Sequence, residues 1–167
     1  MQNVLEKLEQ VLTSELEVHE EFLASSREFN RVIRDEDLDG IDRQRTVQDE
    51  TVCRIEKLEK ERRSCCTVLA RSFGIAREPL KMSMLLEKVP SQWRDRLNSL
   101  QETLKGTVRE VTKISTSNRI LLEEGLRVVQ STYAYVQQAA GSRYAPYGQH
   151  GRTVSKPLLQ SIINKTA

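Results

Sequence analysis

Apolar residues recur every three or four positions along the second half of the chain, from Trp93 to about Ala140. This spacing places them on one stripe of a single long helix. A helix of that length needs other long helices against its stripe, so the pattern predicts an elongated bundle. The stripe consists of Leu97, Leu100, Leu104, Val108, Val111, Ser115, Asn118, Leu122, Leu126, Val129, Tyr133 and Val136.

Two further helical patterns precede this one, over about Asn3 to Arg34 and about Leu38 to Phe73. The first has its stripe at Leu5, Leu8, Leu12, Leu16, His19, Leu23, Ser26, Phe29 and Ile33, with Val11 and Phe22 beside it, and a Glu-rich opposite face that we expect to be solvated. The stripe of the second helix consists of Ile41, Val52, Ile55, Leu58, Cys65, Leu69 and Phe73. We expect the polar Asn118 of the long helix to be a buried residue that fixes register, rather than a binding residue.

The breaks between these helices have recognisable end signals. The first, from Asp35 to Gly40, matches the start of a calcium loop, but Asp42 and Thr46 stand where an apolar residue and a bidentate Glu are needed. Asp37 or Asp39 is therefore predicted to cap the next helix. Gly74 is a predicted helix end. The connector after it contains a short apolar helix over about 80–88, and Ser91 is the predicted N-cap of the long helix.

These patterns predict an all-α fold: an elongated antiparallel bundle of three long, coiled-coil-like helices with a short connector helix and a flexible C-terminal tail. The expected division is 1–140 for the helical bundle and 141–167 for the tail. The tail carries four bases and no acids, and its apolar residues Leu158, Leu159, Ile162 and Ile163 form a narrow patch if that segment is helical. Two interpretations of the tail stay open, a disordered terminus and a partner-binding hook that folds on contact.

Charge and cysteine content narrow the function classes. Residues 1–50 carry 14 acids and 6 bases, whereas the rest carries 10 acids and 20 bases, so an acidic first helix is expected beside basic later ones. No basic stripe is interleaved with aromatic residues, which argues against nucleic-acid binding. Cys53, Cys65 and Cys66 suit neither a disulfide framework nor a zinc site, and we expect no metal or cofactor. We expect neither a signal peptide nor a membrane span, and a cytoplasmic location.

The sequence offers little chemistry for catalysis. It contains no Gly-rich phosphate loop, no GxSxG and no HExxH. His150 lies in the tail, and His19 falls on the stripe of the first helix. We interpret His19 as a packed, hydrogen-bonded residue rather than the phosphoacceptor of a signalling bundle. The chain is therefore predicted not to be an enzyme.

Four segments, taken in order, resemble the FlgN family of bacterial flagellar export chaperones. They are the acidic turn Asp37-Leu38-Asp39, the connector end Leu85-Leu86-Glu87-Lys88-Val89-Pro90, the segment Ile114-Ser115-Thr116-Ser117-Asn118-Arg119-Ile120-Leu121-Leu122, and the Tyr/Gly-rich extension from Tyr144 to Arg152. The resemblance implies a cytoplasmic chaperone that binds the helical terminal segments of hook-associated (hook–filament junction) proteins. It also implies that the chaperone prevents premature assembly of its client and delivers it to the flagellar type III export gate.

The resemblance assigns client binding to the C-terminal region. Carried over to this chain, the client-binding residues would be Leu126, Val129, Tyr133, Val136, Leu158, Leu159, Ile162 and Ile163, with Tyr144 and Tyr147 contacting the export gate. A homodimer in the client-free state stays open. Two alternatives also remain, a self-associating coiled-coil adaptor and a phosphotransfer bundle using His19.

Overall fold

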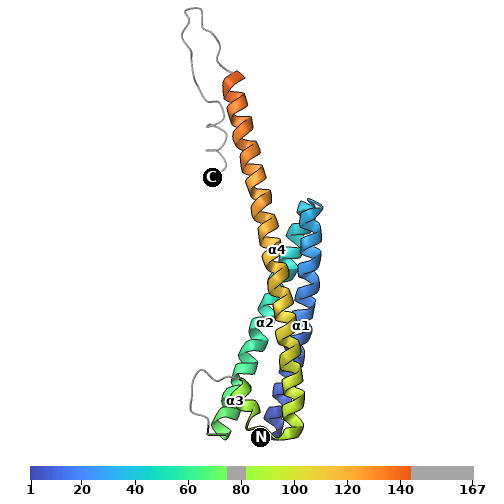
Figure 1. The fold of residues 1–167 in the computed structure, drawn as a ribbon, viewed down its shortest axis with the longest axis vertical. Helices are drawn as coiled ribbons and strands as arrows, with labels where there is room; N and C mark the ends of the chain where they lie inside the picture. The colour runs from blue at the N-terminus through green and yellow to red at the C-terminus, as the bar shows by residue number, and fades with distance from the viewer. Residues whose placement is uncertain (75–81, 144–167) are drawn as a thin grey trace, which may run out of the picture. The chain divides into compact units, whose positions relative to one another are not determined.

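The fold consists of four helices in the part of the chain that the structure describes. This computed structural model describes residues 1–74 and 82–143, with side chains as far as residue 139, and shows no strand in them (Figure 1). The helices are α1 (Gln2–Arg34), α2 (Leu38–Ser72), α3 (Met82–Leu86) and α4 (Ser91–Arg143). The predicted all-α class of long, mutually packed helices is confirmed.

The chain divides into two compact units, residues 1–121 and residues 122–167. In the first unit, α2 runs antiparallel to α1, and the part of α4 up to Leu121 runs in the same direction as α1 (Figure 1). Two contacts fix the parallel pair: Arg96 forms an ion pair with Glu9, and Asn118 lies against Ser26. The division expected between residues 140 and 141 stays a prediction.

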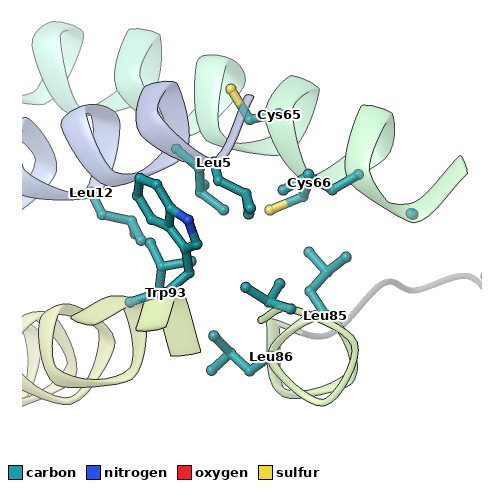
Figure 2. Close-up of a cluster of buried hydrophobic side chains, with 12 residues drawn as sticks. Leu5, Leu12, Cys65, Cys66, Leu85, Leu86 and Trp93 are labelled. Carbon is teal, nitrogen blue, oxygen red and sulfur yellow. The ribbon is translucent and has the colours of Figure 1, made fainter. Parts of the chain in front are cut away.

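The apolar core of the first unit gathers where α3 and the start of α4 meet α1 and α2 (Figure 2). Trp93 and Leu97 of α4 are buried there, next to leucines of α1 and α3. Cys65 and Cys66 are buried there as small apolar residues. The buried members are Leu5, Leu8, Leu12, Cys65, Cys66, Leu69, Ala70, Leu85, Leu86, Val89, Trp93 and Leu97.

Two of the three predicted helix ends are confirmed. The Asp37 carboxylate caps α2 by accepting a hydrogen bond from the Gly40 N–H at 2.9 Å. Gly74 has φ +65°, the left-handed conformation that ends a helix without a Cβ clash. The predicted N-cap at Ser91 is wrong. Ser91 is already helical, and the Pro90 carbonyl accepts the first helical hydrogen bonds, from the N–H groups of residues 93 and 94.

The polar residue predicted to fix register is confirmed as buried. The Asn118 side-chain amide donates to the Ser26 carbonyl at 2.9 Å, and its oxygen accepts from the Asn30 amide at 2.7 Å. Because both polar ends of the Asn118 amide group are satisfied by α1, any axial shift between α1 and α4 would leave a buried polar group unpaired.

Several side chains lie on the other side of the burial boundary from the one predicted, among them Val108 and Ser115 of the long-helix stripe, which are exposed. Glu15, which the predicted stripe of the first helix does not include, is 1% exposed. On α2 the predicted stripe residue Val52 is 40% exposed, while its neighbour Thr51 is buried. Thr51 can be buried because its hydroxyl donates to the Val47 carbonyl at 2.7 Å. In this part of α2 the apolar residues are separated by many polar ones, so the sequence pattern does not determine which side of the helix faces the bundle. Tertiary packing determines it.

A candidate protein-binding surface on α4

The C-terminal part of α4 exposes the large apolar residues to which the resemblance assigns client binding. Leu126 is 59% exposed, Val129 64%, Tyr133 50% and Val136 55%. Leu122, which precedes them in the same spacing, is 40% exposed. These five residues form what we call the first seam. In its first part the long-helix stripe is covered at most positions, with Leu97 and Asn118 buried, but Val108 and Ser115 are exposed. Its continuation from Leu122 finds no cover in the part of the chain that the structure describes.

Helix geometry brings the first seam onto one narrow face. Its members are separated by steps of four, three, four and three residues, and at about 100° per residue they fall within roughly 80° around the helix axis. This is the spacing by which one helix packs along another in a coiled coil. The sequence predicts that these residues share a stripe, and the helical conformation of α4 brings them together.

The opposite face of this segment is polar. Glu123, Glu124, Arg127, Gln130 and Gln138 project there, and the Arg127 guanidinium lies 3.1 Å from the Glu124 carboxylate. Beyond Arg127 no charged residue occurs up to residue 142. The segment is therefore amphipathic, with an uncharged apolar face that charge repulsion does not protect from association.

Two exposed apolar residues of this segment lie outside the predicted stripe. Val128 is 61% exposed and Tyr135 is 72% exposed. Both are visible in the sequence as apolar residues at helical spacing, but a single stripe along the helix does not include them. The other predicted site residues, Leu158, Leu159, Ile162, Ile163, Tyr144 and Tyr147, lie outside the described residues.

The interior of the first unit contains an ion pair between α1 and α2. The Arg62 Nε lies 2.9 Å from both carboxylate oxygens of Glu15. Burial raises the pKa of Glu15 above its usual value, and the Arg62 hydrogen bond and charge oppose that rise. Arg62 thus stabilises the ionised form of Glu15 against the effect of burial.

His19, the candidate phosphoacceptor, is tied to the same turn of α1. Its Nδ1 lies 2.7 Å from the Glu15 carbonyl, and the residue is half-buried. A carbonyl only accepts hydrogen bonds, so Nδ1 carries the proton and donates it. This is the packed, hydrogen-bonded histidine that the sequence predicts.

The buried cysteine thiols lie apart from the hollow on the surface of the first unit. Burial raises the pKa of the Cys66 thiol to about 11, which keeps it protonated and unreactive at neutral pH. A hollow of about 370 Å³ on the first unit has an apolar floor that includes Leu12, Leu104 and Val108 and a rim of basic side chains. Neither of the two buried cysteines nor His19 lines it.

Metal-binding clusters and membrane-spanning helices are both absent from residues 1–74 and 82–143. Within these ranges, no group of three or more His, Cys, Asp or Glu side chains could hold a metal ion. None of the helices there combines the length and apolar character needed to cross a membrane.

Comparison with known families gives one match. The family model described as FlgN protein matches residues 1–155, which include all four helices and the whole exposed segment of α4. No curated protein and no solved structure matches the chain.

Proposed function

Since the chain belongs to the FlgN family, a family of flagellar export chaperones, we propose that it binds hook-associated (hook–filament junction) proteins in the cytoplasm. It prevents their premature assembly and delivers them to the flagellar type III export apparatus. The observation that carries this proposal is the exposed first seam of α4.

The first seam has the properties that a helical client segment needs in its receptor. Its five large apolar side chains are at least 40% exposed and follow heptad spacing. An amphipathic helix of the client would cover them with its own apolar face, in the helix-in-groove mode of peptide recognition. The same cover would hide the client's apolar face, which is how binding would prevent premature assembly.

The segment beyond α4 completes the proposed mechanism. Leu158, Leu159, Ile162 and Ile163 form a second apolar contact with the client, and Tyr144 and Tyr147 contact the export gate. Because different residues would contact the client and the export gate, the chaperone could keep its client bound while it contacts the gate.

The test is a binding measurement with a purified hook-associated protein of the same bacterium. We expect the double substitution Leu126→Ser/Tyr133→Ser to weaken binding by about tenfold or more, because it removes two central apolar contacts. The matched control, Ala134→Ser/Gln138→Ser, changes two residues on the polar face of the same helix segment and should leave the affinity unchanged. Circular dichroism of each variant checks that helix content is preserved.

A truncation after Ala140 tests the second contact. Weaker client binding with unchanged helix content would support the tail as part of the site. If neither the truncation nor the substitution in the first seam weakens binding, the client site lies elsewhere on the chain and the proposed placement is refuted.

Two other functions make different predictions. A self-associating adaptor would form stable homo-oligomers through the first seam and capture no flagellar protein. A phosphotransfer bundle would carry acid-labile phosphate on His19, and the partial burial of that side chain counts against that alternative.

A further inference from the structure

The exposed part of α4 has a second row of residues with the same heptad spacing. Gly125, Val128, Thr132 and Tyr135 follow one another in steps of three, four and three residues. At about 100° per residue they lie within roughly 80° of one another, centred about 100° around the axis from the first seam. We call this row the second seam.

Together the two seams make an apolar face wider than one partner helix covers. The face extends over about 180°, from Tyr135 to Leu126, whereas a helix packed against one neighbour typically needs a stripe of about 100°. In the segment from Leu122 to Val136, every charged residue and every Gln lies outside this arc. The large side chains of the second seam are also open, with Val128 and Tyr135 each more than 60% exposed.

The first unit shows what this helix does with a face of such width. There, the buried face of α4 meets a core to which both long helices contribute, since Leu97 belongs to the same cluster as Leu8 of α1 and Leu69 of α2. Thr107, Ile114 and Ser117 are half-buried beside the fully buried Asn118. A face that covers half of the circumference of α4 thus accompanies a core built by two other long helices.

We propose that the exposed segment of α4 receives two helices of one client at the same time, one along each seam, as a helical hairpin or a pair of adjacent terminal helices. This inference rests on the proposed chaperone function and specifies its client. The contacting faces of both client helices are uncharged, because residues 128–142 of this chain carry no charge that could pair with them.

The shape of the second seam determines how the second client helix approaches. A Cβ added at Gly125 would meet no atom within 4 Å, so the surface there is open as well as flat. Small residues at alternate positions of the second seam allow close backbone approach, and Val128 and Tyr135 supply the contact area.

The experiment compares two double substitutions of closely similar chemistry in the full chain, Leu126→Ser/Tyr133→Ser in the first seam and Val128→Ser/Tyr135→Ser in the second. Ala134→Ser/Gln138→Ser again serves as the polar-face control. The probes are a purified hook-associated protein and a nested series of its terminal fragments that contain one helical segment or two. Affinities are measured by calorimetry and helix content by circular dichroism.

We expect each seam variant to bind the complete client about tenfold more weakly, because each loses one of two helix contacts. A fragment with a single helical segment should be sensitive to one of the two variants only. The complex should have a mass of one chaperone chain with one client.

Four results would overturn the inference. If only the first-seam variant weakens binding, one helix is enough, and the proposed function stands without the second seam. If removing residues 144–167 abolishes the effect of Val128→Ser/Tyr135→Ser, the chain's own tail covers the second seam. A complex of two chaperone chains with one client would assign that seam to a second copy. If neither variant has an effect, the proposed function itself fails on α4.

Discussion

The ion pair between Glu15 and Arg62 should respond unequally to removal of its two members. The Glu15 carboxylate is 1% exposed and lies 2.9 Å from the Arg62 Nε through both oxygens, whereas the Arg62 side chain is 29% exposed. Arg62→Leu therefore leaves a buried carboxylate without its counter-charge. Breaking a buried pair in this way costs about 3–5 kcal/mol of the free energy of unfolding. Glu15→Gln leaves a guanidinium that can turn towards water, and it should cost about 1 kcal/mol.

The cost of Arg62→Leu should also depend on pH. Burial raises the pKa of Glu15 in the folded state, and the substitution removes the two largest opposing contributions, both from Arg62. A carboxyl whose folded pKa is raised binds protons more strongly when folded, so stability falls as pH rises from the unfolded pKa to the folded one. The slope in that window is at most about 1.4 kcal/mol per pH unit. The other charged groups that act on Glu15, His19 and Glu59, are the same in both proteins.

Urea unfolding of the three proteins, followed by circular dichroism at a series of pH values, measures both effects. We expect the difference between the native protein and Arg62→Leu to shrink as pH falls from neutral towards the unfolded pKa of a glutamate. Equal losses for Glu15→Gln and Arg62→Leu, or a difference that is independent of pH, would refute the account of Glu15 as a carboxylate that depends on Arg62.

Three other predictions concern the first unit. Leu69→Ala should lower the free energy of unfolding by about 2–5 kcal/mol because its side chain is fully buried, whereas Val68→Ala next to it, 45% exposed, should change it by less than about 0.5 kcal/mol; urea unfolding compares them. Asp37→Ala should cost about 1 kcal/mol by the same measurement, through loss of the α2 cap, and no change would contradict that cap. Cys53 is exposed and should react with a thiol reagent at neutral pH well before Cys66, whose pKa is raised by burial, and equal rates in the folded protein would contradict the buried core cluster.

The sequence predicts the helices well because their ends depend on local chemistry. Asp37 caps α2 through a hydrogen bond to an N–H only three residues later, and Gly74 ends α2 through its own left-handed backbone conformation. Neither feature requires a contact with a distant part of the chain. The N-cap prediction at Ser91 is wrong for an equally local reason: either Pro90 or Ser91 could precede the first helical turn, and the hydrogen bonds to the Pro90 carbonyl decide between them.

Glu15 could not be placed from the sequence because its burial depends on a residue 47 positions later. A pattern of apolar and polar positions assigns every Glu to the solvated side, and the partner that makes an exception possible, Arg62, comes from another helix. Asn118 could be placed because a lone amide on an apolar stripe must be buried together with its neighbours and can then fix the register. Val128 and Tyr135 are also apolar in the sequence, but a one-stripe interpretation of the long helix leaves them unassigned.

Under the proposed function, the distribution of buried polar groups along α4 argues that its exposed face would tolerate more than one client sequence. In the first unit, Asn118 pairs with Ser26 and Asn30, and such a buried polar contact accepts only one register. Neither seam contains an amide or a charge, only apolar side chains, a glycine and a threonine. A face without a polar residue that fixes register discriminates mainly by apolar area and shape, so helices that differ in sequence but share heptad spacing can occupy it. A chaperone for a class of related export clients needs a surface with this property.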